Sequence, residues 1–126
     1  MKAYTDLDQS KKLAEILPIE SADMCWTNHC YGTLRSSMTI SAKPINEYKN
    51  LLESFADLTG IDVFYPAWSL AALLSVLNCP DLTQTSDGRW YIRTWYLNQP
   101  YSVGGVGDPV DACVEMIIKL HEHKML

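Results

Sequence analysis

The strongest structural signal in the sequence is residues 89–97, RWYIRTWYL, which follow a Ser-Asp-Gly turn at residues 86–88. Successive side chains of a strand point to opposite faces, and this segment alternates with that period. A second strand at residues 82–85 precedes the turn, so the pattern predicts an antiparallel hairpin. The face expected to point into a core consists of Trp90, Ile92, Thr94 and Tyr96.

The opposite face of the same strand mixes cations with aromatic rings. It consists of Arg89, Tyr91, Arg93 and Trp95. Arg, Tyr and Trp dominate the energetics of protein interfaces, so these four residues are the predicted partner-binding face. Two other interpretations have the same composition, namely an ordinary outer face with a helix over part of it and the buried interface of a homodimer.

Four segments are predicted to be helical: residues 5–17, 44–58, 66–77 and 109–122. Thr5 is the expected N-cap of the first helix, with Asp8 returning its hydrogen bond, and Pro18 ends that helix. The third helix begins at Pro66 or, with Ser69 as its cap, one turn later. It is very apolar and is expected to be covered on most sides.

The last helix has a regular apolar stripe, and residues 22–40 have strand composition with an interruption at Asn28–Gly32. That interruption predicts a second hairpin. The order of elements is then α, ββ, α, α, ββ, α. It predicts a single α+β domain over residues 1–126, with a mostly antiparallel sheet of about four strands packed with three or four helices. The stripe expected to face inward consists of Val110, Cys113, Met116, Ile117 and Leu120.

The glycine-rich stretch at residues 101–108, YSVGGVGD, resembles a phosphate-binding loop but departs from its patterns. Val110 stands where a dinucleotide fingerprint needs its third glycine, and Asp108 follows Gly107 where a P-loop needs lysine. Asp108 is the predicted N-cap of the last helix and Asp111 is its N3 residue, so two carboxylates take the place of an anion. We therefore expect a flexible lead-in to a capped helix. The alternative is a pocket for a positive or neutral ligand, whose residues would be Gly105, Gly107, Asp108 and Asp111.

Metal and nucleophile patterns are weak. Cys25, His29 and Cys30 form one loose group, and no second ligand pair has the spacing of a zinc site. His29 and Cys30 are adjacent in a predicted strand, where neighbouring side chains point apart, which argues against a catalytic dyad. No metal, cofactor or catalytic residue is expected.

The net charge of −5 on 126 residues argues against nucleic acid and anionic membrane surfaces as partners. The N-terminal stretch has no apolar signal-peptide core, and no apolar run approaches the roughly 18 residues of a membrane span. A cytoplasmic location with reduced cysteines is the resulting expectation. A protein partner or a homodimer is the expected form of interaction.

Three phrases, DLDQSKKLAEILPIESADMCW, PAWSLAALLSVL and DPVDACVEMIIKLHE, cover both ends and the middle of the chain. They resemble a family of uncharacterised small proteins of Bacteroides-type gut bacteria, often encoded in prophage or other mobile-element regions. The resemblance implies a bacterial or phage-related setting and no mechanism. Two functions remain open: a small non-enzymatic protein-interaction domain, and a ligand-binding or hydrolytic domain with its pocket near residues 101–108.

Overall fold

The computed structural model describes residues 1–27, 30–31, 34–35, 39–42 and 64–126. Its strands form three antiparallel sheets, ordered β4–β1–β5, β2–β3 and β6–β7–β8. The α+β class and the antiparallel pairing are confirmed, and the strands fall into separate sheets rather than one. Along the described part of the chain the elements are α1 (Leu7–Ala14), the 3-10 helix η1 (Ile19–Ser21), β1 (Met24–Thr27), β2 (Cys30–Tyr31), β3 (Leu34–Arg35), β4 (Thr39–Ser41), β5 (Phe64–Ala67), α4 (Leu70–Val76), β6 (Asp81–Gln84), β7 (Trp90–Tyr96), β8 (Gln99–Val106) and α5 (Pro109–Glu122).

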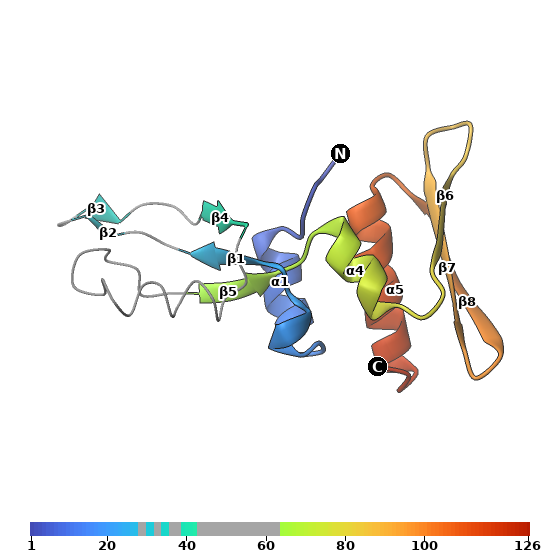
Figure 1. Cartoon of the computed structure of the whole chain (residues 1–126). Helices are drawn as coiled ribbons and strands as arrows, with labels where there is room; N and C mark the ends of the chain where they lie inside the picture. Colours follow the sequence, from blue (N-terminus) through green and yellow to red (C-terminus); the bar gives the residue numbers. More distant parts are fainter. Residues whose placement is uncertain (28–29, 32–33, 36–38, 43–63) are drawn as a thin grey trace.

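Helix α5 lies at the centre of the core. It packs between the β6–β7–β8 sheet on one side and α4 on the other (Figure 1). The predicted bounds of this helix are confirmed, as is its N-cap, Asp108. The predicted inward stripe is also confirmed, since all five of its residues are buried: Val110, Cys113, Met116, Ile117 and Leu120.

The first helix begins one residue later than it would with Thr5 as its N-cap. Its N-cap is Asp6, which forms a capping box with Gln9, so the predicted Thr5–Asp8 pair is wrong. Thr5 is buried because it pairs with Trp68: its N–H donates to the Trp68 carbonyl at 2.9 Å, and its hydroxyl accepts the Trp68 N–H at 3.2 Å. The helix ends at Ala14, before Pro18 is reached.

The predicted third helix is shorter than expected. Ser69 caps it, so the later of the two predicted starts is confirmed and Pro66 belongs to a strand instead. Strand β5 pairs with β1 and lies at an edge of its sheet, where proline is tolerated because one side needs no N–H donor. The helix is also less covered than predicted: Leu73 is fully buried, whereas Ala71 and Ser75 are exposed.

The predicted hairpin around the Ser-Asp-Gly turn is confirmed, and so is antiparallel pairing within residues 22–40. The interruption predicted there at residues 28–32 is wrong, because Cys30 and Tyr31 form β2, which pairs with β3. Strand β1 pairs antiparallel with β4, with Trp26 opposite Ile40. Strand β6 pairs antiparallel with β7 across the Ser-Asp-Gly turn, with Leu82 opposite Ile92. The predicted helix at residues 44–58 lies outside the described residues.

The cap of α5 gives a first prediction. The Asp108 carboxylate accepts hydrogen bonds from the backbone N–H groups of Val110 at 2.9 Å and Lys2 at 2.7 Å. One side chain therefore caps the central helix and also holds the N-terminal segment against it. We expect Asp108→Ala to lower the free energy of unfolding by about 1–2 kcal/mol. Asp108→Asn keeps one acceptor oxygen, which can serve the Val110 N–H but not the Lys2 N–H as well, and should lose about half of that. Urea denaturation measures both, and equal losses would show that the hydrogen bonds are not the cause.

Candidate functional site

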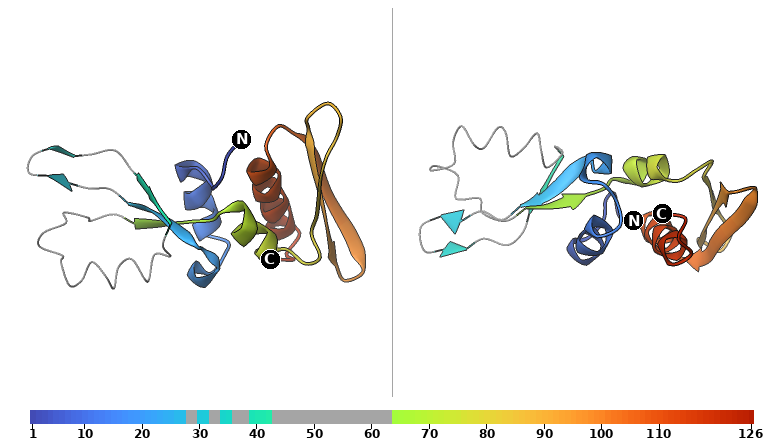
Figure 2. Two further views of the ribbon diagram at one scale, coloured as in Figure 1. Left: turned by 45° about the horizontal axis from the view of Figure 1, so that its top comes forward. Right: turned by 90° about the horizontal axis from the view of Figure 1, so that it is seen from below.

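The candidate site is the face of the β6–β7–β8 sheet that points away from α5. Along β7 the side chains alternate: Ile92 and Thr94 are buried against the core, whereas Tyr91, Arg93 and Trp95 are exposed. No described segment covers these three side chains, and the views in Figures 1 and 2 show α5 on the opposite side of the sheet. The strand period that predicted this face is therefore confirmed in the burial of its residues.

Neighbouring strands complete this surface, hereafter called the outer face. Directly opposed residues of an antiparallel pair share a face. Arg93 therefore lies between Asp81 of β6 and Ser102 of β8, Tyr91 lies beside Thr83, and Trp95 lies beside Pro100. A shallow hollow of about 380 Å³ opens on this face. Its lining residues are Asp81, Thr83, Tyr91, Ile92, Arg93 and Ser102.

The glycines shape one end of the outer face. Gly104 and Gly105 belong to strand β8, so the predicted flexible lead-in is wrong there, and Gly107 lies in the bend before α5. Trp90 pairs with Val106 and Ile92 with Val103, which leaves Tyr91 opposite two residues, Gly104 and Gly105, in a β-bulge. Gly105 has φ +74°, a conformation that bulges assign to glycine. A Cβ on Gly104 would lie 2.3 Å from the Tyr91 ring, so that ring rests on the bare glycine.

The two arginines of the predicted face differ in their surroundings. Arg89 donates from Nη1 to the Gly105 carbonyl at 3.0 Å, and its Nε lies 3.7 Å from Asp87 Oδ2. The pKa of Asp87 is lowered, chiefly by the hydrogen bond from the Thr85 hydroxyl and then by the N–H of Arg89. Arg89 thus fastens the bulge to the turn. Arg93 has no hydrogen-bond or salt-bridge partner among the described residues, so its charge is available to a partner.

Sequence reasoning missed Leu97, at the turn that joins β7 to β8. Leu97 and Asn98 have φ values of +51° and +62°, the pattern of a two-residue type I′ turn. Asn and Gly are the usual residues there, so a leucine at the first position carries backbone strain. Its side chain is 82% exposed. Asn98 was the only available sequence signal, because no Asn-Gly or Asp-Gly pair marks this turn.

Asn78 fixes the backbone beneath Trp95. Its carbonyl accepts the Trp95 N–H at 3.2 Å and also the Thr94 hydroxyl, and its side-chain amide donates to the Trp95 carbonyl. Asn78 lies two residues beyond α4, so the segment that leaves this helix continues the pairing of β6 along β7. Trp95 is 41% exposed on a backbone that is held from both sides.

The second predicted site, around Asp108 and Asp111, receives a cation from the chain itself. The Lys2 ammonium lies 2.8 Å from Asp111 and 3.0 Å from Asp6, and Gln9 donates to Asp111 at 2.7 Å. Gly105 lies in the bulge and Gly107 in the bend before the helix. The sequence predicted that these carboxylates prefer a positive group, and in the structure the Lys2 ammonium is such a group. Fewer carboxylate oxygens therefore remain for a ligand.

The Cys113 thiol, buried on the inward stripe of α5, is not activated. Burial raises the pKa of the Cys113 thiol to about 12, and the negative charge of the nearby Asp108 carboxylate contributes to this rise. A thiol with so high a pKa is a poor nucleophile at neutral pH. His29 lies outside the described residues. In the part of the chain that is described, no group of three or more His, Cys, Asp or Glu side chains is placed to hold a metal ion.

Comparison with known proteins gives no relative for this chain. No protein-family model, curated protein or solved structure matches it. Within the described residues, no helix has the length and apolar character needed to cross a bilayer. The case for a function therefore rests on the geometry of the surfaces.

The Lys2 network gives a prediction with a defined pH dependence. Hydrogen bonding to Asp111 raises the pKa of Lys2 in spite of partial burial. Partial burial acts to raise the pKa of Asp6, but the Gln9 N–H and the Lys2 ammonium outweigh it, so the net pKa is lowered. We expect Lys2→Met to lower the free energy of unfolding at pH 7 by about 0.5–1 kcal/mol, since these ion pairs are partly exposed.

The sign of the pH dependence follows from the two directions. The stabilisation from Asp6 is present above its ordinary pKa of 3.8 and is lost as pH falls through the lowered value. The stabilisation from Lys2 is present below its ordinary value of 10.5 and is lost as pH rises through the raised one. Urea titrations should therefore show a deficit of Lys2→Met that shrinks at both extremes. A matched deficit in Lys12→Met, on the exposed side of α1, would rule out the network as its cause.

The bulge gives a matched pair of glycine variants. Gly104→Ala drives a methyl group into the Tyr91 ring and should cost about 1 kcal/mol while displacing that ring. Gly107→Ala meets no atom within 4 Å and should change the free energy of unfolding by less than about 0.5 kcal/mol. Urea denaturation and the NMR shifts of the Tyr91 ring separate the two. An undisturbed Tyr91 ring in Gly104→Ala would contradict the described contact.

Proposed function

We propose that the chain is a small non-enzymatic protein-interaction domain that binds through the outer face of the β6–β7–β8 sheet. One observation carries this proposal. The large hydrophobic side chains exposed in the described residues are Met1, Tyr91, Trp95 and Leu97, and three of these four come from β7 and the turn that follows it. Exposed apolar groups that gather in one region rather than scatter, here two on the outer face and one in the adjoining turn, indicate an interaction surface.

The residue types and their support favour binding over chance exposure. Tyr, Trp and Arg supply most hot spots of protein interfaces, and the outer face presents all three at Tyr91, Arg93 and Trp95. The bulge opposite Tyr91 and the hydrogen bonds of Asn78 to Trp95 fix the backbone beneath these side chains. Association therefore needs little further ordering of the backbone. Leu97 has a strained backbone conformation in the turn, and its side chain is exposed. Backbone strain of this kind is typical of functional positions.

The charges define the chemistry of the partner. Arg93 offers guanidinium donors that no described residue uses, between the apolar side chains of Tyr91 and Trp95. A carboxylate receives such donors in pairs. The expected partner is therefore a protein segment that carries an acidic residue next to aromatic or aliphatic ones. A second copy of this chain fits less well, because a two-fold axis through the centre of the face would bring Arg93 against its own copy.

Nucleic acid also fits poorly, because Asp81 lies opposite Arg93 and Asp87 lies beside Arg89 on a chain of net charge −5. These carboxylates would repel phosphates. The alternative of a ligand or hydrolytic pocket around Gly105, Gly107, Asp108 and Asp111 has less support, because Lys2 and the helix N-terminus already use the carboxylate oxygens.

The proposal is tested by selecting binders from a random peptide library with the intact chain as bait. We expect enrichment of peptides with Asp or Glu beside aromatic or aliphatic residues. Their affinity should fall about tenfold or more for Arg93→Ala and for Trp95→Ala, and stay unchanged for Lys12→Ala, an exposed cation on α1.

Two outcomes would overturn it. Selected peptides that bind the Arg93→Ala and Trp95→Ala variants as tightly as the original chain would place the interaction elsewhere. Light scattering that shows a dimer which Trp95→Ala converts to a monomer would make the outer face a homodimer interface. In both cases the circular dichroism spectra of the variants establish that they remain folded.

A further inference from the structure

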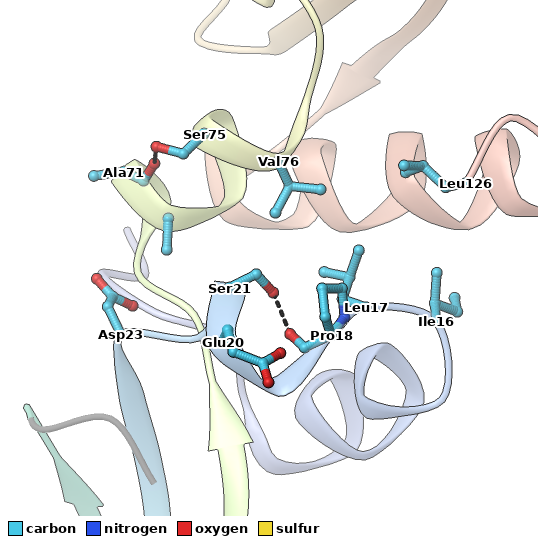
Figure 3. Close-up of a pocket in the computed structure, with 11 residues that line it drawn as sticks. Ile16, Leu17, Pro18, Glu20, Ser21, Asp23, Ala71, Ser75, Val76 and Leu126 are labelled. Carbon is cyan, nitrogen blue, oxygen red and sulfur yellow. Dashed lines mark hydrogen bonds between the residues drawn. The ribbon is translucent and has the colours of Figure 1, made fainter. Parts of the chain in front are cut away.

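A second surface lies on the other side of the core, in a groove between α4 and the turn that joins α1 to η1. Its volume is about 810 Å³. Figure 3 shows the lining side chains of α4 along one bank and those of the α1–η1 turn along the other. The lining residues are Ile16, Leu17, Pro18, Glu20, Ser21, Asp23, Ala71, Ala72, Ser75, Val76 and Leu126.

Local sequence keeps this groove open. The bank on α4 is built from small residues, Ala71, Ala72 and Ser75, and the Ser75 hydroxyl turns back to its own helix at the Ala71 carbonyl, 2.9 Å away. On the opposite bank, Pro18 precedes η1, and its carbonyl accepts the Ser21 hydroxyl at 2.6 Å. The Ser21 hydroxyl oxygen also accepts the indole N–H of Trp68 at 2.9 Å, which anchors this bank to the core.

One end of the groove is apolar and well fixed. Leu126 lies there with Ile16 and Leu17 (Figure 3). The backbone beyond α5 is held by a Schellman motif, in which Lys124 has φ +60° and the Met125 N–H donates to the Leu120 carbonyl at 2.8 Å. The apolar end is therefore a preformed wall.

The other end of the groove is acidic. Asp23 stands there, and its two oxygens accept the N–H and the hydroxyl of Ser69, which caps α4. A carboxylate has about four acceptor positions, so capacity remains on Asp23. Glu20, on the η1 bank, has no hydrogen-bond or salt-bridge partner among the described residues. No lysine, arginine or histidine occurs among the described lining residues.

We infer that this groove binds a small amphipathic cation, with an aliphatic or aromatic body at the apolar end and an ammonium group at the Asp23 end, while Glu20 on the adjoining bank adds negative charge to the groove. The volume lies within the roughly 300–1,000 Å³ of small-molecule sites. The two carboxylates repel an anion and attract an amine, and the apolar lining rejects a fully polar cation. The groove is built by the turn after α1, η1, α4 and the segment after α5, so this site is separate from the outer face.

The inference is tested by titrating the intact chain with hexylamine, hexanol and hexanoate, followed by calorimetry and by the NMR methyl signals of Val76 and Leu126. We expect hexylamine to bind most tightly and to move both methyl signals. Hexanol should bind about two- to fivefold more weakly, because it lacks the charge, and hexanoate should not compete. Each methylene removed from the amine should weaken binding about fourfold.

Variants separate the head and body of the ligand. Glu20→Gln should weaken hexylamine about two- to fivefold, whereas Glu15→Gln, an exposed carboxylate outside the groove, should not. Ala71→Trp places an indole in the groove from an exposed position and should abolish the methyl shifts. Ala14→Trp, an exposed alanine of α1 outside the lining, should leave them intact.

Three results would overturn the inference: hexanoate binding as tightly as hexylamine, unchanged hexylamine binding in Ala71→Trp, or hexylamine binding that is lost in Trp95→Ala. The last would place the amine on the outer face. Because the test uses only groove-directed probes, its failure leaves the peptide selection on the outer face unaffected. Unfolding midpoints in urea confirm for each variant that the fold is retained.

Discussion

The rest of the structure depends on the burial of α5 from two sides. Eight of its fourteen residues are buried, which is more than one apolar stripe supplies, because the β6–β7–β8 sheet covers one side and α4 the other. The sheet gives its inner face to this helix and leaves the opposite face uncovered. Helix α4 gives Leu73 to the core and turns its small residues outward. Both surfaces described above are therefore the reverse sides of elements whose inner sides pack on α5.

Much of this arrangement follows from local sequence patterns. The bounds of α5 could be predicted because an Asp cap, a proline at N1 and an apolar stripe all agree. The burial of β7 could be predicted because strict alternation leaves one way to place Ile92 and Thr94. Local signals failed where tertiary pairing overrode them. Pro66 resembles a helix start in the sequence, but it belongs to a strand that pairs with β1. The glycines of β8 resemble a loop, but the Tyr91 ring packs on Gly104 within a sheet.

The candidate site was predictable to the same degree. Tyr91, Arg93 and Trp95 share a face by period alone, so the sequence is sufficient to group them. It does not show that the Arg89 guanidinium donates to the Gly105 carbonyl, which depends on the bulge, or that the Arg93 side chain has no partner among the described residues. Lys2 and Asp111 are 109 residues apart, and the groove joins residues 16–23 to 71–76 and 126. Contacts at such separations leave no local trace in a single sequence.

The two surfaces are linked by one short segment. Val76 lines the groove at the end of α4, and Asn78, two residues later, holds the backbone of Trp95 on the outer face. A shift of α4 along α5 would therefore reach both places. Thermodynamic coupling needs more than this connection, because an element must have two arrangements that the ligands distinguish. Helix α4 is capped by Ser69, anchored through Leu73 in the core and tied through Asn78 to the sheet. These restraints favour a single position, so each surface is preformed and the two proposed sites should act independently.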